Sequence, residues 1–425
     1  MAGRRSGNWW AHEAAASGMK APSERFLLIL LALVQFTHVV DFMIMMPLGP
    51  QLMDLWRIDT AEFSRLVWMY TLTAGVAGLA AAPFVDRHDR RPVLLWTYAG
   101  FGLATLACSV ARSPDTLLLA RALCGMFGGI AGGAVMTIAA DVVPPERRGA
   151  AMGLVGTSFS AAAAVGVPFG LYLAQKFGWE APFVVLAGLA IVNWILLWNL
   201  LPPVRGHLAD EAGPGFERFL ALLGDANARR GLLFMATLVF GHFAIIPLLA
   251  PHLVGDLRLP REMVPTVYLT GGVLSWISGP LIGRWADEHG KVRVFSVLVW
   301  AACAVTLAIA LAPPSPAWAI IVVTGSYFVF GSGRFVPGQA IQSMAVQPRD
   351  RGAYMSLNGC VRDLAGGLSS GIGGWMVTKA DDGSLRHFDR LGWMAVAAAM
   401  LTLWLVRRVG AREAGAVGVP SAETR

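Results

Sequence analysis

Three polar side chains recur at a regular spacing inside an otherwise apolar stretch. Gln35, His38 and Asp41 follow one another at every third position in the run that begins at Phe26. In a helix this spacing places all three on one face. A charged group near the centre of a bilayer costs roughly 3 kcal/mol even on lenient scales. Asp41 is therefore expected to face either a partner or a cavity.

Arg121 is the expected partner of Asp41. It lies in the sequence RALCG (121–125), at a depth similar to that of Asp41 when both are counted from the outer ends of their predicted helices. If the pair exchanges protons, protonation of Asp41 releases Arg121 and shifts which side of the protein opens. The alternative is a static ion pair that only fixes two helices against each other.

The second half of the chain has its own set of polar residues within apolar stretches. His242 is a second titratable candidate near neutral pH, although a histidine that only hydrogen-bonds within the bundle explains it equally well. Arg334, Arg362 and Asp363 leave this half formally basic. These residues are expected to line the substrate cavity together with Gln35, and they favour a substrate with an anionic or strongly polar group.

The composition is that of a membrane protein. Of 425 residues, 56% are hydrophobic and 14% are charged, compared with about 25% charged in soluble domains. A bilayer core of about 30 Å requires roughly 20 apolar residues per helix. The pattern predicts an all-α polytopic membrane protein whose twelve spans are 26–48, 63–84, 92–111, 116–139, 149–173, 182–202, 231–253, 264–284, 292–312, 318–340, 353–377 and 390–408.

Basic residues predict the orientation of these spans. Most of the 34 Lys and Arg residues fall in the two tails and in the loops that follow even-numbered spans. Basic loops stay on the cytoplasmic side, so the expected location is the inner membrane with both termini cytoplasmic. The net charge of +7 then reflects contact with an anionic lipid leaflet and not a nucleic-acid partner.

Motifs for an enzyme or an ATP-driven pump are missing from the sequence. No phosphate-binding GxxxxGK[ST] motif is present, and no nucleophile stands beside a base. The four cysteines lie inside predicted helices without the spacing of metal ligands, so they are assigned to packing. We expect no enzyme activity, no cofactor and no metal, with a proton gradient as the energy source.

Two repeated motifs divide the chain into similar halves. The sequence APFVDRHDRRPVLL (82–95) returns as GRWADEHGKVRVF (283–295), and RGAAM (148–152) returns as RGAYM (351–355) at nearly the same offset. At that offset His242 matches Asp41. The repetition predicts two pseudo-symmetric six-helix bundles. The expected segments are a tail (1–24), a first bundle (25–202), a linker (203–230), a second bundle (231–408) and a tail (409–425).

These motifs resemble those of the major facilitator superfamily. The family's G-x-L-a-D-R-x-G-R-[R/K] loop is similar to this chain at Asp86, Arg87, Arg90 and Arg91, with Ala82 and Asp89 in place of its glycines, and again at Asp287 and Lys291. The resemblance implies a gating loop that holds one alternating-access state, with Arg90 pairing with an acid such as Asp141. A purely solvated loop is the alternative.

The fifth predicted span indicates the direction of transport. Gly166, Pro168 and Gly170 loosely resemble the G-P-x-x-G-G motif of the family's antiporters. The resemblance implies the drug:proton antiporter or arabinose-efflux branch. The first hypothesis is a monomeric, proton-coupled efflux antiporter of a small amphipathic or sugar-like molecule. Uptake by a proton symporter or uniporter, and uncoupled handling of lipids, remain alternatives.

Overall fold

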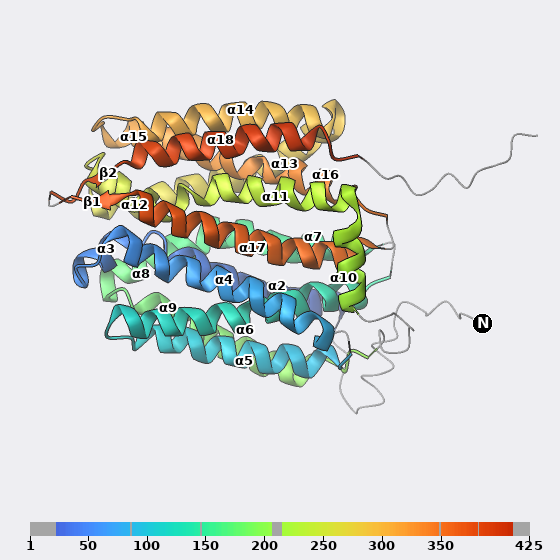
Figure 1. Ribbon diagram of the computed structural model, residues 1–425. Helices are drawn as coiled ribbons and strands as arrows, with labels where there is room; N and C mark the ends of the chain where they lie inside the picture. Colours follow the sequence, from blue (N-terminus) through green and yellow to red (C-terminus); the bar gives the residue numbers. More distant parts are fainter. Residues whose placement is uncertain are drawn as a thin grey trace, which may run out of the picture.

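A computed structural model of the chain describes residues 23–85, 87–144, 147–205, 215–347, 350–380 and 382–410. Most of its helices run nearly parallel to one common axis (Figure 1). The elements in chain order are α2 (Glu24–Ile44), α3 (Gly49–Leu55), α4 (Thr60–Val85), α5 (Arg90–Ser109), α6 (Pro114–Asp141), α7 (Arg148–Ala161), a π-helical turn (Ala162–Gly166), α8 (Val167–Phe177), α9 (Ala181–Leu200), α10 (Gly215–Gly224), α11 (Ala226–Phe243), α12 (Ile246–Gly255), a 3-10 turn (Arg261–Met263), α13 (Val264–His289), α14 (Lys291–Ala310), α15 (Ala317–Tyr327), a second π-helical turn (Phe328–Ser332), α16 (Phe335–Ser343), α17 (Arg351–Met376), the strands β1 (Thr378–Lys379) and β2 (Leu385–Arg386), and α18 (Phe388–Val406).

The helices account for the twelve predicted spans. Within the described residues, nine helical stretches are long and apolar enough to cross a membrane. The other three predicted spans correspond to α4, α13 and α17, each of which is 26 residues long. All three lie where the two halves of the chain meet, since α4 packs along α17 and α13 packs along α7 and α8. The all-α architecture of two six-helix bundles is as predicted.

Prolines interrupt two of the predicted spans. The span predicted at 26–48 is broken, because α2 ends at Ile44 and α3 begins at Gly49 after Pro47. The seventh span breaks in the same way, between α11 and α12, just before Pro247. Proline has no backbone N–H and clashes with the preceding turn. Each first helix of a half therefore carries a short continuation at one end of the bundle.

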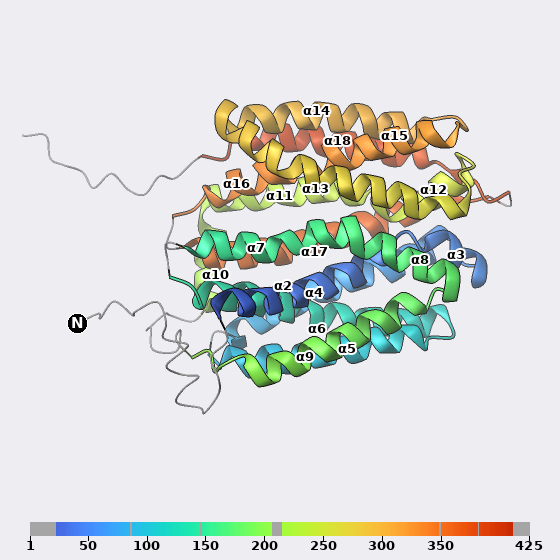
Figure 2. The ribbon, with the colours of Figure 1, turned by 180° about the vertical axis from the view of Figure 1, so that it is seen from behind.

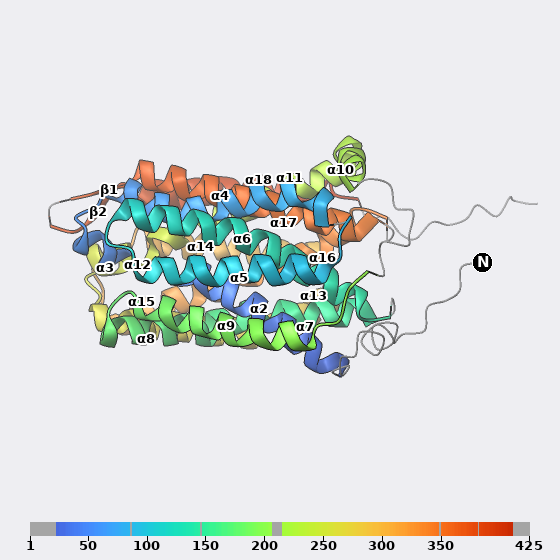
Figure 3. The same ribbon diagram turned by 90° about the horizontal axis from the view of Figure 1, so that it is seen from below.

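The two ends of the bundle are distinguished by what they carry. At one end, which we call the linker end, lie the start of α2, the end of α18 and the helix α10 (Figure 1). At the other, which we call the hairpin end, lie α3, α12 and the antiparallel β1–β2 hairpin. Helix α10 runs across the ends of the other helices (Figure 3) and packs on α4, α11 and α17. The linker expected at 203–230 thus contains a helix and the first turn of α11.

Two helix pairs join the halves. Helix α17 packs along α4, and α13 packs along α7, α8 and the π-helical turn between them (Figure 2). Glycines allow this contact: a Cβ atom on Gly374 of α17 would lie 2.8 Å from Thr60 O of α4, and one on Gly272 of α13 would lie 2.6 Å from the Cα of Ala164. Small residues let helix backbones approach closely, so the halves meet along smooth surfaces.

Within the first half, α6 approaches α4 in the same way. A Cβ atom on Gly129 of α6 would lie 2.7 Å from the Cα of Ala74, which is closer than real Cβ contacts. The neighbouring atom belongs to the backbone and cannot rotate away. Gly133, one turn further along α6, has nothing within 4 Å of its ideal Cβ position.

Replacing Gly129 with alanine should therefore destabilise the protein by about 1–3 kcal/mol, the usual effect of overpacking. The matched control is Gly133→Ala, which should be neutral or slightly stabilising because alanine favours helices. Thermal unfolding of both purified variants in detergent would compare them. Equal melting temperatures for Gly129→Ala and the wild type would contradict this view of the α4–α6 contact.

Candidate functional site

An ion pair between α2 and α6 lies at the centre of the candidate site. Arg121 Nη1 donates to Asp41 Oδ2 at 2.8 Å and to the backbone oxygen of Asp41 at 3.1 Å. Neither side chain is exposed to any degree. The contact expected from the sequence is present, and both charges are fully removed from solvent.

Tyr70 of α4 connects this pair to its surroundings. The Arg121 guanidinium lies 4.4 Å from the centroid of the Tyr70 ring, within cation–π range. The Tyr70 hydroxyl donates to the backbone oxygen of His38 at 3.3 Å, and its ring stacks on Phe42. Sequence reasoning missed Tyr70. The available signal was a tyrosine inside a predicted span, because a buried hydroxyl needs a hydrogen-bond partner.

The remaining polar residues of the α2 face lie on the linker side of the pair. The His38 ring contacts the rings of Tyr70 and Phe101 at 5.7 and 5.9 Å. Within the described part of the chain, neither ring nitrogen of His38 has a hydrogen-bond partner, and neither has Gln35 Oε1. Buried polar groups normally have partners. This face therefore offers hydrogen-bonding groups that the fold itself does not use.

His242 belongs to a different cluster from Asp41. Its ring stacks on Tyr327 with a centroid distance of 5.7 Å and an interplanar angle of 5°, and Nδ1 lies 3.4 Å from the Tyr327 hydroxyl. Gly331, which accepts a hydrogen bond from Arg334 Nε, lies against the His242 ring, since a Cβ atom on Gly331 would be 3.6 Å from His242 Nδ1. As expected from the sequence repeat, His242 lies in the second half, at the position that corresponds to Asp41 in the first. The connection between them passes through Phe42 and Phe243, whose rings are 5.7 Å apart.

Arg362 and Asp363 lie near the middle of α17. Arg362 Nε is 3.8 Å from Asp363 Oδ1, with 43% and 31% of the two side chains exposed. Helix α17, which carries both residues, packs along α4 of the first half.

The loop after α4 has one of its expected contacts. Arg90, at the start of α5, forms an ion pair with Asp141 at the end of α6. Arg91 Nη2 donates to Trp198 O at 2.7 Å, whereas Arg87 is exposed in the turn. Asp86 lies outside the described residues. The loop thus ties α5 to α6 and α9 at the linker end.

The departure from the family pattern at Asp89 has a structural role. Its carboxylate caps α5 by accepting from Arg91 N at 2.9 Å, and it also accepts from Val204 N and from Arg205 Nε at 2.9 Å. In the second half, Lys291 Nζ is 3.2 Å from Asp287 Oδ1 in an exposed pair. The two repeats of the loop therefore differ in their contacts.

The residues of the fifth-span motif face α2. A Cβ atom on Gly166 would overlap Val40, and one on Gly170 would lie 2.7 Å from Ile44 Cδ1. Pro168 follows the π-helical turn, since its ring and missing N–H disturb the helix four residues earlier. Turns of this kind are frequent at functional sites.

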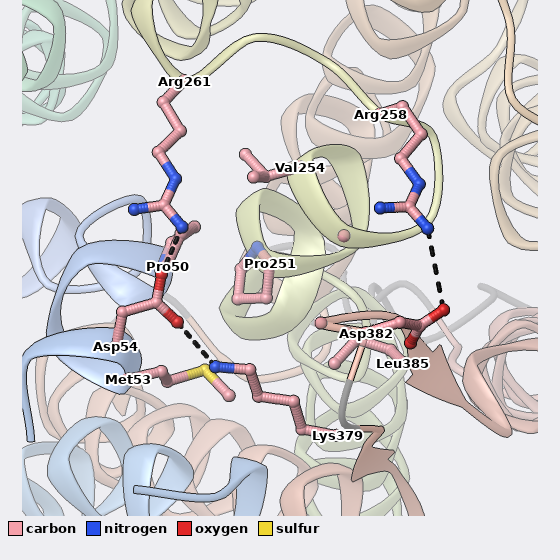
Figure 4. Close-up of a pocket in the computed structure, with 12 residues that line it drawn as sticks. Pro50, Met53, Asp54, Pro251, Val254, Arg258, Arg261, Lys379, Asp382 and Leu385 are labelled. Carbon is pink, nitrogen blue, oxygen red and sulfur yellow. Dashed lines mark hydrogen bonds and ion pairs between the residues drawn. The ribbon is translucent and has the colours of Figure 1, made fainter. Parts of the chain in front are cut away.

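At the hairpin end, ion pairs hold the halves together. Asp54 of α3 contacts Arg261 and, at 2.7 Å, Lys379 Nζ, both from the second half (Figure 4). Thr60 adds hydrogen bonds to the backbone oxygens of Gly374 and Val377. Asp54, Arg261 and Lys379 border a surface cavity of about 220 Å³, and we call their two ion pairs the Asp54 lock. Sequence reasoning missed this lock because its three charged residues come from distant segments, α3, the 3-10 turn and β1.

The Asp54 carboxyl lies outside the membrane-spanning segments and has a perturbed pKa. Partial burial acts to raise this pKa, but the hydrogen bonds and charges of Lys379 and Arg261 outweigh burial and lower it below the usual carboxyl range. The lock therefore persists through mildly acid conditions. Among the described residues, no group of three or more His, Cys, Asp or Glu side chains is placed to hold a metal ion.

Comparison with known proteins settles the family. The sequence model described as Major Facilitator Superfamily matches residues 31–370 and 232–422. The chain belongs to this superfamily of membrane transporters. The transporter is 22% identical to the uncharacterized MFS-type transporter YbcL of Bacillus subtilis over 382 residues, which cover 90% of this chain and 96% of YbcL. It is 31% identical to the gallate transporter of Pseudomonas putida over 198 residues, which cover 46% and 44% of the two chains.

Solved structures share the fold of the transporter. A bacterial homolog of the human lysosomal transporter Spinster matches with a TM-score of 0.70 and 17% identity, over 91% of this chain and 95% of that one. The xylose transporter XylE of E. coli matches with a TM-score of 0.70 and 14% identity, over 90% and 96% of the two chains. At these identities the likeness establishes the major facilitator fold and leaves the substrate unspecified.

Loss of the Asp54 carboxylate should open the hairpin end. In a background without the native cysteines, a cysteine at Val254 would report access to the cavity, and Asp54→Asn should raise its rate of labelling by a maleimide several-fold. Asp382→Asn is the control, because Asp382 pairs with Arg258 at 3.6 Å with both side chains about 60% exposed. Exposed pairs contribute little. Similar rates for Asp54→Asn and the wild type would argue against the lock.

The pH dependence of this labelling follows from the lowered pKa of Asp54. A carboxylate with a depressed pKa keeps its partners at every pH above the ordinary carboxyl value, and loses them as the pH falls through the lowered one. The rate should be divided at each pH by that of a small reference thiol, because the reactive thiolate becomes rarer as the pH falls. This corrected labelling rate should be constant from pH 8 to 5 and rise only below about pH 4. A rise between pH 7 and 6 would assign the opening to another group.

Proposed function

We propose that this chain is a proton-coupled secondary transporter that exports a small amphipathic or sugar-like molecule in exchange for protons. The observation that supports it is the fully buried ion pair of Asp41 and Arg121 on the polar face of α2. Buried charges are held in membrane helices chiefly at ion, proton and substrate pathways. The same face carries the unpartnered polar atoms of Gln35 and His38.

Protonation of Asp41 is the proposed coupling step. While Asp41 is ionised, it balances the charge of Arg121 in a site without water, where such interactions are strong. A proton on Asp41 removes this balance and leaves Arg121 as an uncompensated buried cation, which is strongly unfavourable. Tyr70 contacts Arg121, the backbone of His38 and Phe42, and Phe42 contacts Phe243 of the second half. The change of charge thus acts where the halves meet.

The basic loops assign the linker end to the cytoplasm. Both termini are then cytoplasmic in the inner membrane, and the Asp54 lock faces outward. In this state the outer side is closed, as an alternating-access cycle requires for one of its two forms. The protein acts as a monomer in the lipid bilayer and needs no cofactor, because one charge crossing 100 mV provides about 2.3 kcal/mol.

Export is favoured by the fifth span. Gly166 and Gly170 let this span contact α2, and the π-helical turn lies where α13 of the second half packs against it. A span of this kind can bend while it remains in contact with both neighbours. Together with the resemblance of Gly166, Pro168 and Gly170 to the antiporter motif, this supports our proposal that the transporter belongs to the drug:proton antiporter or arabinose-efflux branch.

Uptake of an organic acid together with protons is the second candidate. The similarity to the gallate transporter of Pseudomonas putida covers 198 residues, and the basic side chains Arg334 and Arg362 suit an anionic substrate. Liposomes with pH gradients of either sign distinguish the two candidates. Antiport moves substrate and protons in opposite directions, whereas symport moves them in the same direction.

Replacement of Asp41 with asparagine should abolish substrate-driven proton movement in liposomes that contain the purified protein. The asparagine side chain cannot be ionised, so the site can no longer exchange a proton. Removing one partner of a buried pair also destabilises a protein by about 3–5 kcal/mol, so the variant should melt at a lower temperature. Proton movement at the wild-type rate in this variant would exclude Asp41 as the coupling group.

The double variant Asp41→Asn/Arg121→Gln separates folding from coupling. It removes both charges and should regain most of the lost stability, because no buried charge is left unpaired. Substrate-driven proton movement should remain absent. If the double variant recovered this movement, the pair would be only structural.

The variant Arg121→Lys tests the geometry of the pair. Lysine keeps the charge but lacks the planar guanidinium that contacts the Asp41 side chain and backbone and the Tyr70 ring. Coupled transport should fall sharply while the protein stays folded. Full transport activity would favour a static ion pair whose detailed geometry is unimportant.

A further inference from the structure

The buried arginine of the second half has no carboxylate partner. Arg334 is 4% exposed, and its Nε donates to the backbone oxygen of Gly331 at 3.1 Å. Within the described part of the chain no Asp or Glu lies within ion-pair distance of it. Arginine cannot lose its proton in a protein, so this charge is permanent. Arg121, which is fully buried in the first half, has Asp41 as its partner.

The two terminal nitrogens of Arg334 are available for a ligand. They make no hydrogen bond to any described residue. They also keep some exposure to solvent, because they are not among the polar atoms that are fully buried without a partner. Arg121 differs, since its Nε and Nη2 are sealed. The fork of Arg334 therefore borders accessible space, and a planar guanidinium binds carboxylates through two parallel hydrogen bonds.

The groups around Arg334 are neutral and mostly aromatic. Gly331, which accepts from Arg334 Nε, lies against the ring of His242 of α11, and this ring stacks on Tyr327 of α15 and contacts Phe335, the residue next to Arg334 in the chain. The rings of His242 and Phe335 are 5.3 Å apart. One cation among hydroxyl, imidazole and phenyl groups suits a small molecule with a single negative group on an apolar body.

This cluster reaches the boundary between the halves. The ring of His242 is 5.8 Å from that of Phe243, and Phe243 contacts Phe42 of the first half. Phe42 in turn stacks on Tyr70, which contacts Arg121. A ligand on Arg334 would therefore be linked by packed rings to the Asp41–Arg121 pair.

We propose that Arg334, with His242 and Tyr327, binds the carboxylate of the transported molecule, and that the substrate is a small organic anion with an apolar body. This inference rests on the proposed transport function and names its substrate class. The ligand carboxylate takes the place, in the second half, of the charge that Asp41 supplies in the first. Arg334 thus serves ligand binding at the expense of stability, as functional residues often do.

Binding to the full chain in phosphatidylcholine nanodiscs tests the proposal. Benzoate and octanoate are the carboxylate probes, and benzyl alcohol and benzylamine are the neutral and cationic controls. The wild type should bind at least one carboxylate and neither control. Arg334→Gln should weaken that binding about ten- to a hundredfold, the usual effect of losing a charge-assisted hydrogen bond, and Arg334→Lys should weaken it less. The control Arg258→Gln, at the hairpin end, should bind like the wild type.

Several outcomes would overturn the proposal. These are a wild type that binds neither carboxylate, an Arg334→Gln variant with unchanged affinity, and displacement of benzoate by chloride or by phosphatidylglycerol at similar concentrations, which would indicate an inorganic ion or a lipid headgroup. Proton movement that is driven by a neutral or cationic compound and depends on Asp41 would contradict the inference that the substrate is an organic anion. It would leave the proposed proton-coupled transport intact.

Stability without ligand gives an independent readout. Arg334→Met removes a buried charge that has no acidic partner, so its melting temperature should equal or exceed that of the wild type. Arg121→Met is the matched variant, and it should melt at a lower temperature because Asp41 is then buried alone. A loss in Arg334→Met as large as that in Arg121→Met would assign Arg334 a structural role and overturn the proposal.

Discussion

The balance of buried charge is the constraint on which this structure depends. In a bilayer an ionised side chain must find an opposite charge or a polar space, and the first half meets this demand with the pair Asp41 and Arg121. The contact fixes α2 against α6, and Tyr70 on α4 joins through its ring and hydroxyl. Three helices of the first half thus meet at one electrostatic centre. In the coupling step that we propose, a change in the charge of this pair moves these helices.

The two halves handle this constraint differently although their architecture repeats. The first half balances Arg121 with Asp41. In the second half Arg334 lies near His242 and Tyr327, and no acid among the described residues is within ion-pair distance of it. A chain that needed only stability would have little reason to keep such a residue, because apolar side chains would pack there at lower cost. In the function that we propose, this asymmetry separates two tasks, proton exchange in the first half and ligand binding in the second. Phe42 and Phe243 lie where the two meet.

The two halves contact each other in two different ways, through closely packed small residues along the helices and through ion pairs at the hairpin end. Along α4 and α17 the contact is made by glycines and small side chains, which let the helices pack closely, with a hydrogen bond from Thr60 to Gly374 at the hairpin end. At the hairpin end the contact is made by charges, with one carboxylate, Asp54, holding Arg261 and Lys379. Smooth packing permits a change of angle, and a few polar bonds at one end decide which angle is held. This division suits a transporter that must open at alternate ends.

Much of the fold was predictable because its signals are local. The lengths of the apolar runs placed all twelve spans, and repeated motifs indicated two halves. The broken first and seventh spans and helix α10 were not predicted, since prolines were counted as part of apolar runs and a short amphipathic helix resembles a linker. The pairing of Asp41 with Arg121 was predictable from the free-energy cost of an ionised carboxylate in the bilayer, because few other cations lie at that depth in the first half.

The sequence by itself determined the membrane-spanning architecture and which buried residues carry charge, because hydropathy and ionisation belong to single residues and short runs. Only the tertiary structure decided which charges are compensated. How distant helices pack determines four features of the site. These are the distance between His242 and Asp41, the position of Tyr70 over Arg121, the Asp54 lock, and the lack of an acidic partner for Arg334 among the described residues. Distances between helices are not encoded in any local pattern, and electrostatic balance depends on those distances.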